Sequence, residues 1–179
     1  MSNATKNVTA ADLTQQHVDD YRRNGFIQID DVFAGDELAT LRDAVASAVE
    51  AEKVASPVDP NRTPTPYETI FVQKVNLWRK YPAVAQFVTS KRLGNIAARL
   101  EGLPMRVWHD QALFKEPGKG NNKTPWHQDA VYWPHVDRWR QITVWIALQD
   151  ATLQNGCMAF INGTHSLLSL IHISEPTRR

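Results

Sequence analysis

The chain has only one cysteine, Cys157, among its 179 residues, so no disulfide can form within it. A lone thiol is typical of a reducing compartment, and we expect the protein to be cytoplasmic. No apolar run approaches the roughly 20 residues that a membrane-spanning helix needs. The polar start MSNATKNVTA also lacks the hydrophobic stretch of a signal peptide. Twenty basic and nineteen acidic side chains leave a net charge of +1, which indicates no nucleic-acid or membrane-surface partner.

What remains is the composition of an ordinary globular domain, 42% hydrophobic and 22% charged, and long enough to enclose a core. The first hundred residues carry helical spacing. Thr9 resembles an N-cap with Asp12 in the first turn, and Asn24-Gly25 ends that helix. We expect further helices from Gly35 through Val49, over 83–88, and over 93–100 up to Gly102.

Beyond Pro104 the residues become β-branched and aromatic, which is typical of strands. We expect strands over 106–114, 141–148 and 157–161, besides a short one at 26–30. The proline-rich stretch 56–66 and the Gly/Asn segment 118–122 are expected loops. The order predicts an α+β fold in which helices flank a mainly antiparallel β core.

The most informative residues are His127 and Asp129 in "TPWHQD". Two residues apart on a strand, their side chains point to the same face, so an imidazole nitrogen and a carboxylate oxygen can meet at one point. Those are two ligands of the 2-His-1-carboxylate triad that holds non-haem Fe(II) and leaves positions open for a co-substrate and O2. A bare His-x-Asp pair also arises by chance, so its surroundings decide its weight.

Those surroundings match a known family. The stretches are "TPWHQDAVYWP", "VWIALQDAT" and "NGCMAFINGTHSL", preceded by the opening "YRRNGFIQIDDVF". With them the chain resembles the phytanoyl-CoA dioxygenase family of Fe(II)- and 2-oxoglutarate-dependent oxygenases, from about residue 10 to 167. The resemblance implies a double-stranded β-helix (a cupin-like jelly roll), with iron at its mouth and the N-terminal helices packed outside.

The resemblance also implies site residues. His127 and Asp129 match the first two iron ligands, and Lys74, Gln111 and Trp145 match positions that contact 2-oxoglutarate. A dicarboxylate needs cationic and hydrogen-bonding partners, and an aromatic wall restricts water near the metal. Each of the three has an ordinary alternative: a solvated lysine, a glutamine without a ligand, and a tryptophan of the core.

The third ligand is where the chain departs from the family. His165 in "NGTHS" is the obvious candidate by spacing. In the family, however, the distal ligand is a different histidine, several tens of residues further on and followed by an arginine that pairs with 2-oxoglutarate. We therefore expect His165 to shape the site or its loop.

The tail imitates that distal pair with His172 and Arg178. Residues 168–178, "LSLIHISEPTR", are however what a transposase adapter of DNA sequencing libraries would encode. We therefore expect a partial oxygenase domain at 1–167, incomplete at its C-terminus, and an artefact at 168–179. A jelly roll without its last strands would expose unpaired edges and hold iron weakly, so the fragment itself is expected to be inactive.

The expected activity of the intact enzyme is hydroxylation of an unactivated C–H bond in a small organic substrate, with O2 consumed and 2-oxoglutarate converted to succinate and CO2. Asp129 favours hydroxylation, because related halogenases lose this carboxylate to make room for a halide. Two alternatives stay open: a cupin-like metalloenzyme that does not use 2-oxoglutarate, and a non-catalytic jelly-roll binding module. The substrate and the oligomeric state do not follow from the sequence.

Overall fold

The computed structural model describes residues 7–55, 63, 72–114, 124–129, 133 and 140–167. Some of the segments discussed above lie outside these residues: most of the loop 56–66, the segment 118–122 and the tail 168–179.

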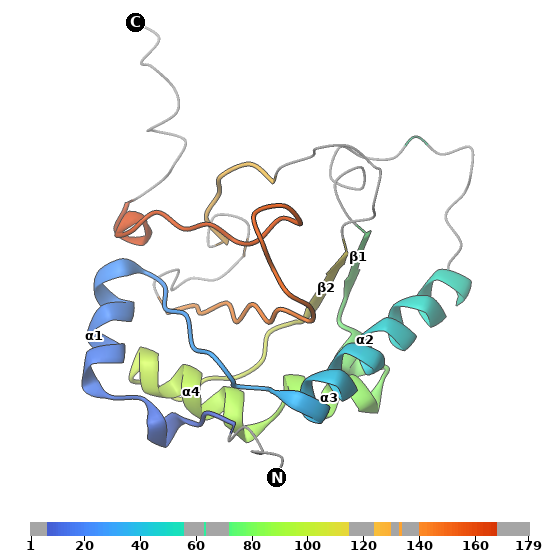
Figure 1. The fold of residues 1–179 in the computed structure, drawn as a ribbon, viewed down its shortest axis with the longest axis horizontal. Coiled ribbons are helices and arrows are strands. Elements are labelled where there is room, and N and C mark those ends of the chain that lie inside the picture. Colours follow the sequence, from blue (N-terminus) through green and yellow to red (C-terminus); the bar gives the residue numbers. More distant parts are fainter. Residues whose placement is uncertain are drawn as a thin grey trace, which may run out of the picture.

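Helices precede most of the extended chain, as expected (Figure 1). The elements in chain order are η1 (Ala10–Asp12), α1 (Gln15–Asn24), α2 (Gly35–Ala55), β1 (Val72–Val75), η2 (Leu77–Arg79), α3 (Pro82–Val88), α4 (Lys91–Glu101), β2 (Gln111–Phe114) and η4 (Thr164–Ser166). Figure 1 shows the segment 140–167 in orange and red running toward the β ribbon and returning to α1, where η4 lies. No helix of the described ranges is both long and apolar enough to cross a membrane.

The four expected helices are present, and their ends follow capping chemistry. The Thr14 hydroxyl accepts from the backbone N–H of His17 at the start of α1, and Gly25 ends the helix in the left-handed region at φ 84°. Gly102 ends α4 in the same way at φ 75°. The expected cap at Thr9 belongs instead to the short helix η1, where Asp12 Oδ2 accepts from Thr9 N at 2.9 Å. The first helix therefore starts later than Thr9 predicts.

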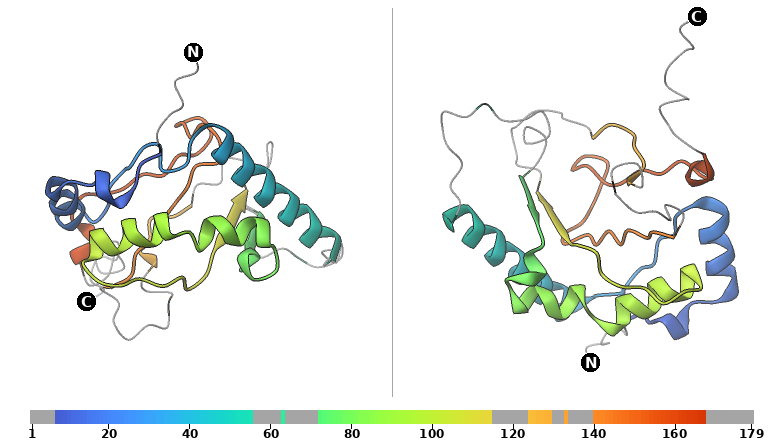
Figure 2. Two further views of the ribbon diagram at one scale, coloured as in Figure 1. Left: turned by 90° about the horizontal axis from the view of Figure 1, so that it is seen from below. Right: turned by 180° about the vertical axis from the view of Figure 1, so that it is seen from behind.

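The main core lies under α2, whose inner face carries the predicted apolar stripe. Leu41, Val45 and Val49 are buried and Leu38 packs at the margin. The buried partners come from the loop before α2, from η2, α3 and β2: Phe33, Leu77, Val84, Phe87 and Ala112. A second, smaller cluster joins Leu13, Ile96 and Leu100 where η1 meets α4. These two clusters hold the helices along one side of the molecule (Figure 2).

The sheet in the described residues is smaller than expected: a single antiparallel pair of β1 and β2. Lys74 lies opposite Ala112, and Val75 opposite Gln111. Of the strand expected over 106–114, only the last four residues pair. The expected strands at 26–30, 141–148 and 157–161 are wrong for this structure, since none of them is a strand.

These segments were misassigned because a strand needs a hydrogen-bonded neighbour as well as an apolar face. Ile27 and Ile29 pack on the smaller cluster, so the alternation at 26–30 is real, and Ile146 and Leu148 pack on the main cluster although Val144 is 46% exposed. No described segment pairs with them as a ladder. The jelly roll expected from the family is therefore not formed by the described residues.

Candidate functional site

The side chains of His127 and Asp129 converge as the pattern predicts. Nε2 of His127 lies 3.3 Å from Oδ1 of Asp129. Both side chains are accessible, with 39% and 42% of their surface exposed. Residues 124–128 have no regular secondary structure, so the convergence does not come from a strand. Their role as iron ligands stays a prediction.

The outward atom of each side chain is held by a neighbour. Nδ1 of His127 donates to the carbonyl of Pro125 at 2.8 Å, and the Thr143 hydroxyl donates to Oδ2 of Asp129 at 2.8 Å. A neutral imidazole that donates from Nδ1 has a lone pair at Nε2. The 3.3 Å between Nε2 and Oδ1 is that of an ion pair when the imidazole is protonated, and two ligands of one cation can have it when the imidazole is neutral.

The spacing fits a metal ion. Two ligands at right angles, each about 2.1 Å from a divalent ion, lie roughly 3.0 Å apart. The observed 3.3 Å is close to that value. The bonds to Pro125 and Thr143 are of the kind that orient metal ligands from behind. Sequence reasoning missed both residues, although Pro125 stands only two positions before His127.

A third ligand is not among the residues that the structure describes, where no three His, Cys, Asp or Glu side chains gather. His165, the candidate by spacing, lies instead at the end of α1, where its Nε2 donates to the carbonyl of Arg22 at 3.1 Å. This contact fits the expectation that His165 shapes the local structure.

Two of the expected co-substrate residues lie on the β ribbon but on opposite faces. Residues directly opposite each other in an antiparallel pair share a face, and successive residues alternate. Lys74 shares the inner face with the buried Ala112, whereas Gln111 shares the outer face with Val75. In this structure they do not face a common point.

Lys74 faces the helices. Its charge helps lower the pKa of the Glu52 carboxyl on α2, although the main cause is the hydrogen bond from Lys80, 2.9 Å away. An ordinary electrostatic role is therefore open to Lys74 besides the expected contact with the co-substrate.

Gln111 faces the other way and connects to the segment that follows the ligand pair. It accepts from Gln73 at 2.8 Å, and its Nε2 lies 2.7 Å from Nε2 of His109. The His109 ring packs edge-on against Trp133 at 5.5 Å. A chain of side chains thus runs from the outer face of the ribbon to Trp133, four residues beyond Asp129.

Trp145 lies two residues after Thr143, the residue that donates to Asp129. Ile142, Ile146 and Leu148 pack on the core clusters, whereas Val144 and Trp145 are both 46% exposed. Trp145 is therefore not the core tryptophan of the ordinary alternative. Its contact with 2-oxoglutarate stays a prediction.

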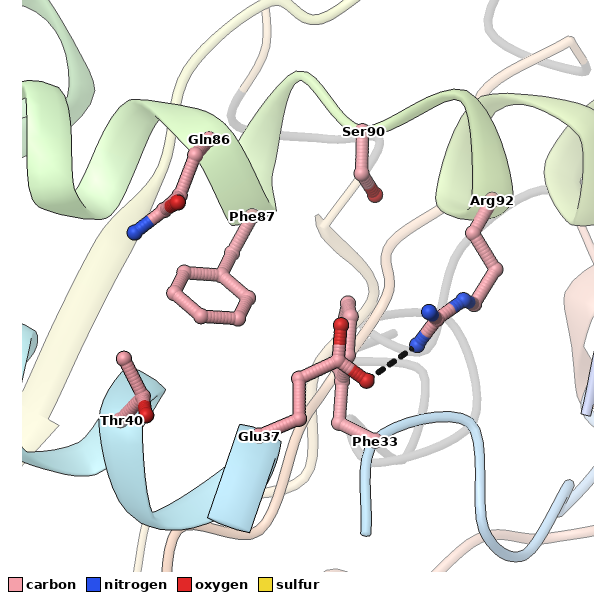
Figure 3. Close-up of a pocket in the computed structure, with 7 residues that line it drawn as sticks. All are labelled: Phe33, Glu37, Thr40, Gln86, Phe87, Ser90 and Arg92. Atoms are coloured by element: carbon pink, nitrogen blue, oxygen red, sulfur yellow. Dashed lines mark hydrogen bonds and ion pairs between the residues drawn. The ribbon is translucent and has the colours of Figure 1, made fainter. Parts of the chain in front are cut away.

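A depression of about 450 Å³ lies elsewhere, between α2 and the helices α3 and α4 (Figure 3). Its lining is Phe33, Glu37, Thr40, Gln86, Phe87, Ser90 and Arg92. The Arg92 guanidinium pairs with Glu37 at 2.6 Å and lies over the Phe33 ring at 5.0 Å. Because the charge of Arg92 is already compensated, this depression does not compete with the ligand pair as a site for an anionic co-substrate.

A model of the family described as phytanoyl-CoA dioxygenase matches residues 21–171. The chain is 36% identical over 85 residues to a phytanoyl-CoA dioxygenase domain-containing protein 1 of Danio rerio, covering 48% of this chain and 29% of that protein. It is 26% identical over 155 residues to the ectoine dioxygenase of Sphingopyxis alaskensis, covering 81% and 47%.

A solved structure is similar as well: the non-haem α-ketoglutarate-dependent carbocyclase SnoK from nogalamycin biosynthesis. The TM-score is 0.54 at 27% identity, covering 64% of this chain and 43% of that one. The chain thus spans less than half the length of each of these three proteins. Together, the family match and the solved structure imply a cupin-like fold.

Proposed function

The chain belongs to the phytanoyl-CoA dioxygenase family, and on that premise we propose that it acts in an Fe(II)- and 2-oxoglutarate-dependent hydroxylase of a small organic substrate. The observation that supports this best is the ligand pair: Nε2 of His127 and Oδ1 of Asp129 face each other at 3.3 Å. The proposal includes the rest of a jelly-roll core around the described residues, and a cytoplasmic location.

Bound iron and 2-oxoglutarate would supply the oxidising power, with O2 consumed, succinate and CO2 released, and one C–H bond of the substrate hydroxylated. The residues of this chain would orient the two metal ligands and hold them in place. The bond to the Pro125 carbonyl keeps a proton of His127 on Nδ1 and orients the ring, so that Nε2 is the atom that would bind the metal. The Thr143 hydroxyl holds Oδ2 of Asp129, which leaves Oδ1 directed at the same point.

The co-substrate contacts are proposed individually because the structure separates them. Trp145 is an exposed side chain two residues after Thr143, and Gln111 lies on the face of the ribbon that leads to Trp133. Lys74 lies on the opposite face of the ribbon, so 2-oxoglutarate would have to reach that face to contact it. We expect Gln111→Ala and Trp145→Ala to weaken 2-oxoglutarate binding more than Lys74→Met does, measured by titration calorimetry in the presence of Fe(II).

The decisive experiment follows succinate formation from 2-oxoglutarate, with Fe(II) and O2 supplied. We expect turnover in the full-length protein that contains this chain and its loss in His127→Ala and Asp129→Ala, together with loss of metal binding. Asp19→Ala is the matched control, because Asp19 is an exposed carboxylate on α1 that accepts a local hydrogen bond from Gln15. Metal binding without any use of 2-oxoglutarate would favour the cupin-like alternative. If the protein binds neither Fe(II) nor 2-oxoglutarate, the non-catalytic jelly-roll binding module remains as the alternative.

A further inference from the structure

The turn formed by residues 162–167, here called the docked turn, sits on the C-terminal end of α1. The backbone N–H of Gly163 donates to the carbonyl of Asn24 at 2.8 Å, and Nε2 of His165 donates to the carbonyl of Arg22 at 3.1 Å. The last carbonyls of a helix have no partner within the helix. The docked turn therefore supplies donors that the end of α1 lacks.

The surfaces of the turn and the helix end fit closely. A β-carbon placed on Gly25 would lie 2.3 Å from Nδ1 of His165, so the ring occupies space that only glycine leaves open. Next to it, the rings of Phe26 and Phe160 stack with centroids 4.6 Å apart and planes 14° from parallel. Figure 1 shows η4, in red, beside the end of α1, in blue.

Gln128 connects this docked turn to the ligand pair. Its side-chain amide donates to the carbonyl of Thr164 at 2.7 Å and lies 3.5 Å from that of Leu167. His127 and Asp129, the residues on either side of it, direct their side chains at each other instead. The residue between the two ligands thus ties the ligand segment to the docked turn, which is tied in turn to α1.

We propose that Gln128 is a positioning residue for the metal pair and that it acts through the docked turn. The inference rests on the proposed function of that pair. The bond from His127 to Pro125 is local and moves with the segment, and Thr143 holds the Asp129 carboxylate, so the ligand segment gains from a further fixed reference in the molecule. The amide of Gln128 provides that fixed reference, because the turn it binds is docked on a helix. A metal site loses affinity for its ion when a contact that positions one of its ligands is removed.

The test measures binding of Co(II), added alone as a stand-in for Fe(II), by titration of its visible absorption. We expect Gln128→Ala to weaken binding by roughly 10-fold or more, the usual effect of removing a supporting contact. Gln128→Glu keeps the size of the side chain but presents an oxygen to the Thr164 carbonyl, so it should weaken binding as well. The intensity and shape of the Co(II) absorption should change too, because they report the coordination geometry.

The second arm uses His165→Ala, which removes an exposed side chain that bonds the end of α1. We expect weaker Co(II) binding here too. If Gln128 and His165 act along one path, the double variant should bind Co(II) almost as tightly as the single variant with the lower affinity. The effects of coupled residues on affinity do not add. This arm also carries the test if Gln128→Ala fails to fold.

Two variants control for ordinary loss of stability. Gln16→Ala removes an exposed glutamine of α1 that makes a local hydrogen bond to Asp20. Tyr21→Phe removes the hydrogen bond to Glu101 that holds α1 to α4, and so destabilises the same helix. Both should keep wild-type Co(II) affinity.

Unchanged Co(II) binding in Gln128→Ala or in His165→Ala would overturn the inference alone, as would a Tyr21→Phe variant that loses as much affinity as they do. A wild-type protein that binds no Co(II) and no Fe(II) would overturn the proposed function together with it.

Discussion

Gly25→Ala should be more damaging than a similar change at the other helix end, because the new methyl group meets a ring. Gly25 and Gly102 both end helices in the left-handed region, at φ 84° and 75°. At Gly102 the nearest atom to an added β-carbon is the end of the flexible Arg22 side chain, at 3.2 Å. At Gly25 three atoms of His165 lie within 2.8 Å.

The two costs can be separated. An alanine in the left-handed region costs about 1–2 kcal/mol, and this applies to both positions. At Gly25 the His165 ring must also move away and lose its bond to the Arg22 carbonyl, which adds roughly 0.5–1.5 kcal/mol. We therefore expect about 1.5–3.5 kcal/mol of lost unfolding free energy for Gly25→Ala, and about 1–2 kcal/mol for Gly102→Ala.

The assay is urea unfolding followed by far-ultraviolet circular dichroism. In a His165→Gly background the ring is absent, so Gly25→Ala should then cost no more than Gly102→Ala does. A Gly25→Ala penalty equal to that of Gly102→Ala in the wild-type background would refute the docking of His165 on α1. The docking would also be refuted if the losses of unfolding free energy caused by Gly25→Ala and by His165→Gly simply add in the double variant.

Three further results are expected. Leu77→Ala should lower the unfolding free energy by about 2–5 kcal/mol in the same urea assay, since Leu77 is 2% exposed in the main core; a loss under about 1 kcal/mol would contradict this packing. Burial, then the bond to Glu101, raises the pKa of Tyr21 far above its ordinary value of 10.0. Its stabilising effect is therefore complete below that value and is lost as pH rises above it, so unfolding free energy should fall above about pH 10 and fall less steeply in Tyr21→Phe. Thr143→Val should weaken Co(II) binding by leaving Oδ2 of Asp129 without its donor, and equal binding in this variant would show that the Thr143 bond does not orient the carboxylate.

The helical half of the fold was readable from the sequence because its signals are local. Gly25 and Gly102 end their helices as their positions indicate, and the apolar stripe of α2 faces the core. The strand signals failed because alternation reports only which side chains are buried. Ile146 and Leu148 are packed on the core, yet their segment has no described ladder partner.

The family motifs and the convergence of His127 with Asp129 also came from the sequence, because two side chains so close in the chain need little help to meet. The contacts that support this pair could not be predicted from the sequence. Thr143 is 14 positions from Asp129, and Gln128 meets Thr164 across 36 positions. No local pattern signals such contacts, because the packing of distant segments creates them.

The sequence by itself therefore determined the family, the helices and the convergence of His127 with Asp129, all of which depend on neighbouring residues. Only the tertiary structure decided how that pair is held, through Thr143 and through Gln128 on the docked turn. It also decided that Lys74 and Gln111 lie on opposite faces, because β1 and β2 pair Lys74 with Ala112. A shift of one residue would have placed them on the same face, and the register depends on contacts that only the folded chain makes.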